Sequence, residues 1–276
     1  MYSPPSDPAA EQRMRTALAD AAGHLHVQIT GELRWGVGGR TLCAPVQHPD
    51  DGACWLRLAT LPAAKADAGD RLWTGTADAA RFDGKVNKPR LVAIHDTYRD
   101  GQALRAELTE YVSEPVCAPS PVLLQELDVT GMWWASLRAD LAVIATTGTD
   151  RRAVRQEWID RAVPRYTGRP APRITEWTAA HADLHPANLT RHTPVILDWE
   201  GHGLAPAGYD PAMLMAHCLL VPVTAARVRR EFADVLETEP GRAAQLVVAA
   251  ELLQSAERGY YTELVTSLRN LVQSLP

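Results

Sequence analysis

The sequence predicts an α+β protein in which a small antiparallel-sheet part precedes a larger helical part. Between residues 26 and 112, short runs of strand-forming residues are separated by glycine turns, among them Arg99-Asp-Gly101. From residue 131 onward, apolar residues recur at helical spacing, as in Gln245–Leu253. The chain has 276 residues, of which 46% are apolar. This is enough for two modest domains, each with its own core.

The N-terminal part is expected to begin with a helix. Asp7 is suited to cap a helix and Pro8 to occupy its first position, so we expect a helix over residues 8–22. A second helix is expected over residues 71–81. The expected strands cover residues 26–34, 40–46, 53–59, 91–97 and 103–112.

The remainder of the chain is expected to be helical after a linker. Residues 113–121 are rich in proline and serine, which predicts a linker between a domain of residues 1–112 and a domain of residues 122–276. The expected helices cover residues 131–147, 150–163, 209–220, 224–236, 241–258 and 260–275.

Composition excludes several classes of protein. The net charge is −5 and the sequence pI is about 6.0, which argues against a nucleic-acid partner. The four cysteines show no CxxC spacing and are expected to be free thiols in a reducing compartment. We find no signal peptide and no apolar run of the ~20 residues that a membrane span needs. We therefore expect a cytoplasmic protein, monomeric or homodimeric, that acts on a small molecule.

Residues 178–200 hold a cluster of polar side chains. Asp183, Asn188 and Asp198 lie within sixteen positions, and the last follows the apolar run Val195–Leu197. This run predicts a short buried strand that would carry Asp198 to the mouth of a core, where an unpaired carboxylate is costly. A divalent cation would compensate the charge, and Mg²⁺ prefers the oxygen ligands that Asn188 and Asp198 offer. Asp183 can face the same pocket without binding the metal.

Two features of the N-terminal part allow alternative interpretations. The turn formed by Gly36, Val37, Gly38 and Gly39 is either an ordinary hairpin turn or a flap over a nucleotide phosphate, because glycine lets backbone N–H groups approach. Arg57 lies in an apolar strand, where its charge faces either solvent or an anion.

Three segments resemble a known family. His181-Ala-Asp183-Leu-His185-Pro-Ala-Asn188 resembles the HxDxxxxN catalytic loop of protein-kinase-like enzymes, in the form typical of the aminoglycoside phosphotransferase and choline kinase branch. Leu197-Asp198-Trp199-Glu200 resembles the metal-binding IDWE segment of that branch, and Tyr209-Asp210-Pro-Ala resembles the stretch that follows it. The resemblance implies a two-lobed protein-kinase-like fold.

The resemblance also implies roles for residues of the C-terminal part. Asp183 would be the catalytic base. Asn188 and Asp198 would hold Mg²⁺ bridging the phosphates of ATP. His181 and Asp210 would support the catalytic loop.

In the N-terminal part the resemblance implies a nucleotide site. Arg57 would replace the phosphate-gripping lysine of protein kinases, and Gly36, Gly38 and Gly39 would cover the phosphates. Residues 107–112 would form the hinge, with Glu110, Tyr111 and Val112 offering backbone groups to adenine. The acidic partner of Arg57 is expected to be Asp78 or Glu32, with Asp78 favoured.

The implied reaction is transfer of the γ-phosphate of ATP to a hydroxyl of a small molecule. An aminoglycoside or a related antibiotic is the expected acceptor. The alternatives are a metabolic kinase for an amino alcohol, sugar or nucleoside, and a pseudokinase that binds ATP without transferring phosphate. The joint presence of Asp183, Asn188 and Asp198 favours an enzyme.

Overall fold

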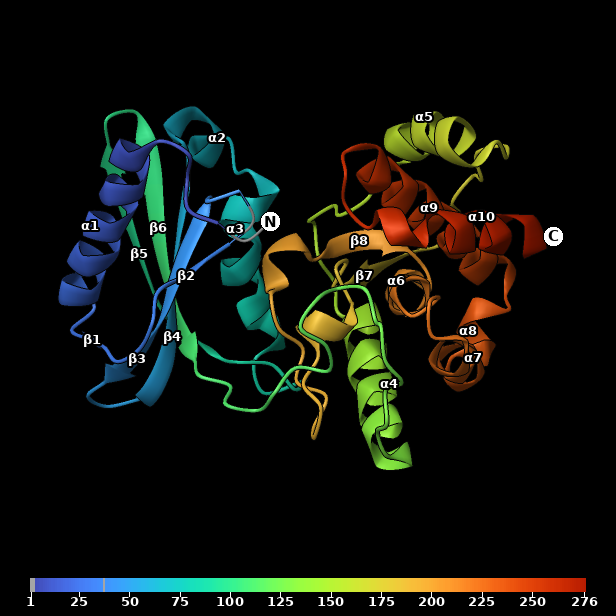
Figure 1. Ribbon diagram of the computed structural model, residues 1–276, viewed down its shortest axis with the longest axis horizontal. Coiled ribbons are helices and arrows are strands. Elements are labelled where there is room, and N and C mark those ends of the chain that lie inside the picture. Colours follow the sequence, from blue (N-terminus) through green and yellow to red (C-terminus); the bar gives the residue numbers. More distant parts are fainter. Residues whose placement is uncertain (1–2, 37) are drawn as a thin grey trace. The chain divides into compact units, whose positions relative to one another are not determined.

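The computed structural model describes residues 3–36 and 38–276, and it contains two compact units (Figure 1). The first comprises Met1–Gly84 and Lys88–Ser113, and the second comprises Lys85–Asn87 and Glu114–Pro276. The predicted α+β class is confirmed, since an antiparallel sheet occupies the first unit and helices dominate the second. No helix in the described part of the chain is long and apolar enough to span a membrane.

The first unit is built on one antiparallel sheet. Its strand order is β1-β3-β4-β6-β5, and β2 pairs with β3 beside this path. The elements are α1 (Pro8–His24), β1 (Gln28–Ile29), β2 (Arg34–Trp35), β3 (Thr41–His48), β4 (Gly52–Pro62), α2 (Ala63–Asp67), α3 (Arg71–Asp78), β5 (Leu91–Arg99) and β6 (Gln102–Glu110), with a 3₁₀ turn over Ala79–Phe82.

Helix α1 begins as expected and packs its apolar side on the sheet. The Asp7 carboxylate accepts hydrogen bonds from the N–H groups of Ala9 (2.9 Å) and Ala10 (3.2 Å), which satisfies two donors that the helix cannot use itself. The buried positions of the helix recur at a spacing of three and four residues: Met14, Ala17, Leu18 and Ala21. They pack against alternate residues of β4 and β6, including Leu56 and Leu108.

The two faces of this sheet are covered by different helices. Figure 1 shows α1 on one side of the sheet and α3 on the other. Because side chains alternate along a strand, the neighbours of Leu56 and Leu108, namely Arg57 and Glu107, point away from α1. The sheet therefore presents an apolar face to α1 and a face with charged groups to the other side.

Most expected strands are confirmed, with one clear exception. The Asp100-Gly101 turn joins β5 to β6, and both residues have positive φ (52° and 73°), as the tight hairpin turn requires. The strand expected over residues 26–34 is wrong. Only the two-residue strands β1 and β2 form there, because His26 takes a positive φ of 55° and the segment between β1 and β2 leaves the ladder.

The second unit is a group of helices with one small hairpin. Helix α9 packs against α5, α6, α8 and α10, and α4 packs against β7. The elements are α4 (Gly131–Thr146), α5 (Gln156–Thr167), β7 (Trp177–Ala180), β8 (Gly203–Pro206), α6 (Tyr209–His217), α7 (Pro222–Glu231), α8 (Ala233–Leu236), α9 (Glu239–Glu257) and α10 (Val265–Ser274), with 3₁₀ turns over Pro186–Asn188, Trp199–Gly201 and Thr262–Leu264.

Two short segments on the N-terminal side also belong to the second unit. Residues 114–121, expected as a linker, pack on it, and the Cys117 N–H donates to the Leu189 carbonyl at 2.7 Å. Asn87 donates to the buried Asp140 carboxylate through its backbone (3.2 Å) and side chain (2.9 Å). Its own carbonyl accepts from the Ile196 N–H at 2.8 Å.

Several expectations for the second unit are wrong in detail. The helix expected over residues 260–275 begins only at Val265, after a 3₁₀ turn. The helix expected over residues 150–163 begins only at Gln156, because residues 153 and 154 donate backbone hydrogen bonds to the Leu204 carbonyl. The helix expected over residues 224–236 is divided at Phe232 into α7 and α8. The strand expected at Val195–Leu197 is reduced to one isolated bridge between Leu189 and Ile196.

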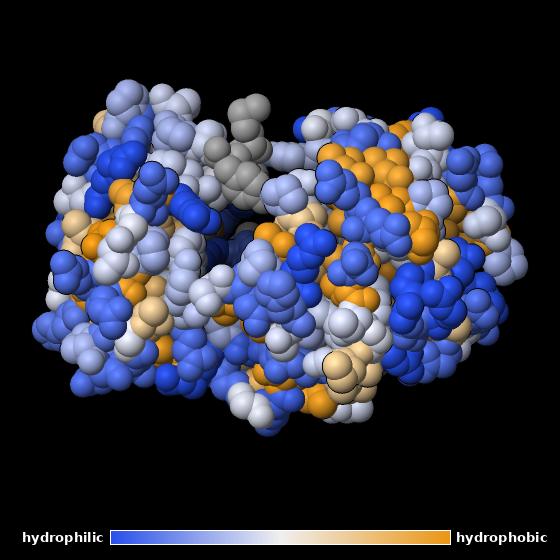
Figure 2. Space-filling view, turned by 60° about the horizontal axis from the view of Figure 1, so that its bottom comes forward, coloured by the Kyte–Doolittle hydropathy of each residue, from blue (hydrophilic) through white to orange (hydrophobic). Residues whose placement is uncertain are grey.

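The mean hydropathy of the chain is −0.19, which is slightly hydrophilic. Hydrophilic residues cover much of the face drawn in Figure 2, and hydrophobic side chains show between them in patches. Apolar atoms contribute a large share of the surface of most folded proteins.

Candidate active site

The hairpin β7–β8 holds the ends of the loop that contains the candidate catalytic residues. Ala180 and Gly203 are paired in its ladder, so residues 181–202 leave the hairpin and return to it at the same point. A bridge between Leu189 and Ile196 and a hydrogen bond from the Leu197 N–H to the Asn188 carbonyl (2.9 Å) cross the loop. These links place Asn188 and Asp198 in neighbouring turns of the backbone.

Asp210, at the start of α6, fixes the first turn of this loop. Its buried carboxylate accepts hydrogen bonds from the N–H groups of His181 (2.7 Å) and Ala182 (2.8 Å). Ala182 has a φ of 66°, a left-handed conformation that costs an alanine about 1–2 kcal/mol. Burial raises the pKa of Asp210, and the nearby His181 and the two N–H donors oppose that shift. Asp210 thus stabilises a turn that the backbone alone disfavours.

His181 connects this turn to the segment that carries Asp198. Its Nε2 atom lies 2.8 Å from the Leu197 carbonyl oxygen, and its ring packs edge-on against Trp199 with centroids 5.0 Å apart. His181 is completely buried. The supporting position predicted for His181 and Asp210 is consistent with these contacts.

The side-chain amide of Asn188 contacts Asp183. The Nδ2 atom donates to the Asp183 carbonyl at 3.0 Å and approaches the Asp183 carboxylate at 3.4 Å. Since both contacts use the nitrogen, the amide oxygen of Asn188 remains the atom that can bind a cation. Asp183 itself is about half exposed, with 51% of its side-chain surface accessible. A substrate can therefore reach its carboxylate.

Asp198 occupies a turn with an uncommon backbone conformation. Its φ of 60° and ψ of 70° lie in the left-handed region, which aspartate tolerates better than most residues. The flanking carbonyls are bonded: that of Ile196 accepts from the Trp199 indole N–H at 2.8 Å, and that of Trp199 lies 3.0 Å from Nδ1 of His202. The turn is thus held from both sides while its carboxylate points outward.

The exposure of Asp198 corrects one step of the sequence argument. Its side chain is exposed, so burial does not require a cation there. The fit to Mg²⁺ depends instead on the donors present, an exposed carboxylate on Asp198 and a free amide oxygen on Asn188. Among the described residues no group of three or more His, Cys, Asp or Glu side chains could hold a metal. Two protein oxygen ligands fit Mg²⁺, which keeps several waters and takes further ligands from phosphates.

Two buried histidines, one in the 181–202 loop and one at the end of α6, pack against each other beside Asp183. The Nε2 atom of His185 is 3.7 Å from an Asp183 carboxylate oxygen, and its ring packs edge-on against His217. Burial lowers the pKa of His185 to about 4, with Asp198 opposing, and lowers the pKa of His217 to about 3. Both imidazoles are therefore neutral at pH 7.

In the first unit, Arg57 has a partner that the sequence argument did not name. Arg57 on β4 and Glu107 on β6 are directly opposite in the ladder, and their side chains form an ion pair at 2.8 Å. Glu107 is 2% exposed and Arg57 18%. Asp78, the favoured candidate, forms an ion pair with Arg81. The missed residue lay in the segment assigned to the hinge, and only strand register could have revealed it.

The glycine turn has the geometry of a hairpin between β2 and β3. The Gly36 N–H donates to the Thr41 carbonyl at 2.9 Å, and Gly38 and Gly39 have positive φ (64° and 68°). A Cβ atom on Gly36 would lie 1.9 Å from the Thr41 hydroxyl. A side chain at position 36 would therefore displace Thr41, and the positive φ of Gly38 and Gly39 favours glycine at those two positions. Contact of this turn with phosphate stays a prediction. Val37, within this turn, lies outside the described residues.

The three residues predicted to contact adenine differ in whether their backbone N–H groups already have an acceptor. The N–H groups of Glu110 and Tyr111 donate to the Arg90 and Ala53 carbonyls, at 3.0 and 3.2 Å. Within the described part of the chain, the Val112 N–H has no such bond. Of the three donors, the Val112 N–H is therefore the one suited to a base.

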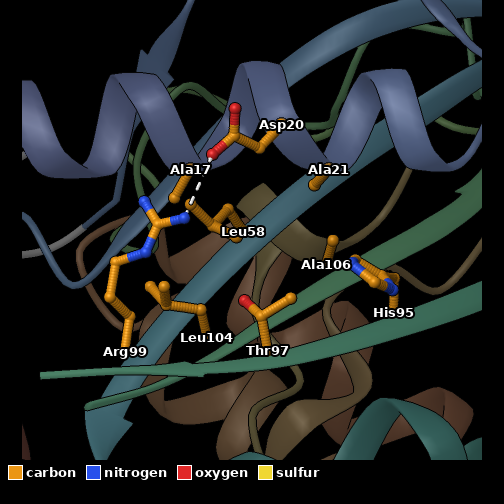
Figure 3. A pocket seen from close by; sticks show the side chains of 9 residues that line it. All are labelled: Ala17, Asp20, Ala21, Leu58, His95, Thr97, Arg99, Leu104 and Ala106. Carbon is orange, nitrogen blue, oxygen red and sulfur yellow. Dashed lines mark ion pairs between the residues drawn. The ribbon is translucent and has the colours of Figure 1, made fainter. Parts of the chain in front are cut away.

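A small cavity of about 60 Å³ lies on the other face of this sheet, between α1 and the strands (Figure 3). His95, Thr97 and Arg99 line it from β5, and Arg99 forms an ion pair with Asp20 of α1 at 3.7 Å. Small-molecule sites usually measure ~300–1,000 Å³. This cavity is too small for a nucleotide and lies on the opposite face from Arg57.

Comparison with known proteins defines the class as a phosphotransferase. A family profile described as "Phosphotransferase enzyme family", abbreviated APH, matches residues 58–246, which include every candidate site residue of the second unit. Because the match spans more than half of the 276 residues, the chain belongs to this phosphotransferase enzyme family. The predicted family relationship is confirmed. Arg57 and the glycine turn precede the matched region. None of the curated proteins compared matches the chain.

Several solved structures are similar at low sequence identity. A spectinomycin phosphotransferase, APH(9)-Ia, solved with ADP and spectinomycin, shares 10% identity over 95% of this chain and 98% of that one, with a TM-score of 0.45. An aminoglycoside phosphotransferase from Alicyclobacillus acidocaldarius shares 15% identity over 90% and 91%, with a TM-score of 0.44. A choline/ethanolamine kinase family protein from Mesorhizobium loti shares 14% over 93% and 94%, with a TM-score of 0.41.

Proposed function

We propose that this chain is an ATP- and Mg²⁺-dependent kinase that transfers the γ-phosphate of ATP to a hydroxyl group of a small molecule. The observation that supports this most directly is the arrangement of the 181–202 loop. Asp183 is accessible, Asn188 is hydrogen-bonded to it, and Asp198 lies in the adjoining turn. Membership of the phosphotransferase family supports the same class of reaction.

In the proposed reaction Asp183 orients the acceptor hydroxyl and takes its proton. A new bond forms between the hydroxyl oxygen and the γ-phosphorus, and the bond from that phosphorus to the β–γ bridging oxygen breaks, leaving ADP. When bound, Mg²⁺ would neutralise the negative charge of the phosphates. Asn188 and Asp198 would hold it through their amide and carboxylate oxygens. Positioning and charge neutralisation supply most of the rate in phosphoryl transfer.

The first unit would supply the nucleotide contacts. Arg57 would bind a phosphate while Glu107 fixes its guanidinium, and the N–H groups of Gly36, Gly38 and Gly39 would approach the phosphates. Glu110, Tyr111 and Val112 would lie beside adenine, with the Val112 N–H as the donor.

The acceptor is proposed as a class. An aminoglycoside or related antibiotic comes first, and an amino alcohol, sugar or nucleoside is the alternative. The test incubates the purified chain with ATP and Mg²⁺ and measures ADP release with each acceptor class in turn. Mass spectrometry then identifies the phosphorylated product. ATP binding without ADP release or phosphorylated product from any acceptor would indicate the pseudokinase alternative.

Asp183→Asn tests the assignment of the base. The substitution keeps the shape of the side chain and removes its ability to accept a proton, so we expect kcat to fall by about 10²–10⁴-fold. The Kd of ADP, measured by calorimetry, should stay within about twofold, since Asp183 is not assigned to the nucleotide. Asp160→Asn, an exposed acid on α5, serves as the control. Unchanged kcat in Asp183→Asn would remove Asp183 from the reaction.

A further inference from the structure

Arg151, in the segment between α4 and α5, forms hydrogen bonds to the turn that follows Asp198. Its Nε atom donates to the His202 carbonyl at 3.0 Å, and its terminal NH₂ group donates to the Glu200 carbonyl at 3.1 Å. A guanidinium group is a planar fork with fixed N–H directions. One side chain thus bonds two carbonyls that are separated by one residue.

The backbone of Arg151 is anchored at the same place. Its carbonyl accepts from the Leu204 N–H at 2.7 Å, and the Ala153 N–H donates to the Leu204 carbonyl at 3.0 Å. A Cβ atom on Gly203 would lie 2.7 Å from the Ala153 nitrogen, so the approach of this segment to β8 requires glycine at position 203. Side chain and backbone of Arg151 therefore both fix the segment between Asp198 and β8.

Side chains from two different parts of the chain bond the backbone on the two sides of Asp198. On its N-terminal side, the Leu197 carbonyl lies 2.8 Å from Nε2 of His181. On its C-terminal side, Glu200 and His202 are bonded to Arg151. Asp198 stands between these attachments with a left-handed backbone that would relax if either side were released.

We propose that Arg151 is a positioning residue for the metal ligand Asp198. It acts through the carbonyls of Glu200 and His202, which hold the Asp198 backbone in the conformation that presents its carboxylate. Mg²⁺ demands near-ideal ligand geometry, so a freed turn binds it less tightly. This inference rests on the proposed function, in which Asp198 binds the metal.

The test measures how strongly Mg²⁺ tightens the binding of ADP. Calorimetry gives the Kd of ADP in Mg²⁺ and the Kd of ADP in EDTA. The Kd in EDTA divided by the Kd in Mg²⁺ measures how much the metal tightens binding, and it does not depend on turnover. In Arg151→Met, which keeps the aliphatic stem but loses the fork, we expect this ratio to fall about tenfold, as is common when groups that orient metal ligands are removed. The Kd in EDTA should stay within about twofold of the wild type.

Arg152→Met is the matched control. It removes an equal charge one position away, from a residue that is exposed. It should leave the ratio unchanged. If Arg151→Met does not fold, Arg151→Lys decides, because lysine keeps the charge and the stem and should lower the ratio to an intermediate value.

Two negative results are distinguishable. If the wild type itself shows no effect of Mg²⁺ on ADP binding, the proposed metal site at Asn188 and Asp198 is wrong. If the wild type shows the effect and a folded Arg151→Met or Arg151→Lys retains all of it, only the role of Arg151 is overturned. A parallel loss in Arg152→Met would likewise overturn it, since removal of charge alone would then explain the change.

Discussion

At the scale of single residues, the candidate site depends on side chains that bond to backbone. Asp210 bonds two N–H groups around Ala182, His181 contacts the Leu197 carbonyl, and Arg151 bonds two carbonyls after Asp198. Ala182 and Asp198 both have positive φ without being glycine. Strained residues of this kind persist only where their surroundings hold them.

Asp210→Ala should therefore destabilise the protein. The variant leaves the N–H groups of His181 and Ala182 without their charged acceptor, and hydrogen bonds to charged groups contribute about 1.5–3 kcal/mol each. We expect the free energy of unfolding, measured by urea denaturation, to fall by about 2–4 kcal/mol. Asp234→Ala is the control, because its exposed ion pair with Arg138 is worth at most about 1 kcal/mol. Equal losses in the two variants would contradict the role given to Asp210.

The residues of the candidate site could be predicted from the sequence where they belong to a motif. The positions of His181, Asp183, Asn188, Asp198 and Asp210 were predicted together, and the structure places them in one loop and the helix that follows it. Glu107 and Arg151 were missed because neither lies in a motif. Their importance comes from strand register and from a backbone approach across about fifty residues, and a linear pattern contains neither.

At the scale of elements, the sheet of the first unit separates two environments. Alternate residues of β4 and β6 pack under α1, and the residues between them form the Arg57–Glu107 pair on the opposite face. The ion pair is well shielded from water, so Glu107 holds the guanidinium in one position. A preoriented cation loses less freedom when it binds an anion.

Arg57→Met should weaken the binding of nucleotide phosphates. We expect the Kd of ADP to rise about tenfold or more, the size of a lost hydrogen bond to a charged group, while the Kd of adenosine, which carries no phosphate, stays the same. Calorimetry with both ligands checks this.

Arg99→Met is the control for the Arg57 experiment. Arg99 is on the same sheet but faces α1, where it pairs with Asp20. Its loss should change neither Kd. If adenosine and ADP weaken by the same factor in Arg57→Met, a general change in the sheet would explain the result and Arg57 would have no phosphate role.

Prediction of elements from sequence succeeded where local signals are strong and failed where pairing decides. The cap at Asp7, the Asp100-Gly101 hairpin and the long helix α9 all follow from local sequence. Residues 150–155 have helical composition, but the backbone of residues 151, 153 and 154 bonds to Leu204 of β8 instead. Val195–Leu197 have strand composition but form only one isolated bridge. The hairpin β7–β8 was missed because its partners lie far apart in the chain.

At the scale of the whole molecule, buried histidines make stability depend on pH. The pKa values of His185 and His217 are lowered by burial to about 4 and about 3, whereas an unfolded chain has a histidine pKa of about 6.5. Below about pH 6.5 the unfolded chain binds protons that the folded chain excludes. The stability that arises from keeping these two histidines neutral is therefore fully present above this pH, and it is lost as the pH falls toward 4.

When the pH is lowered from 7.5 to 5.5, we expect the free energy of unfolding to fall by about 1.4 kcal/mol for each of the two histidines. His217→Phe keeps an aromatic ring against Tyr261 but cannot be protonated, so it should remove about half of this pH dependence. Urea denaturation at the two pH values measures the difference. His192→Phe, at an exposed position, should leave the pH dependence intact. If the free energy of unfolding of His217→Phe changes with pH as much as that of the wild type, His217 does not contribute to the pH dependence.

The pairing of Ala180 with Gly203 also makes the candidate site replaceable as a unit. Residues 181–202 leave and re-enter the hairpin at adjacent points, so an exchange of this loop for that of another family member changes no distance that the rest of the chain must span. The attachments that would have to be kept include those at Cys117, Asn87, Trp133, Arg151 and Asp210. Chimaeras cut at these two positions would exchange the proposed catalytic chemistry while retaining the helices that surround it.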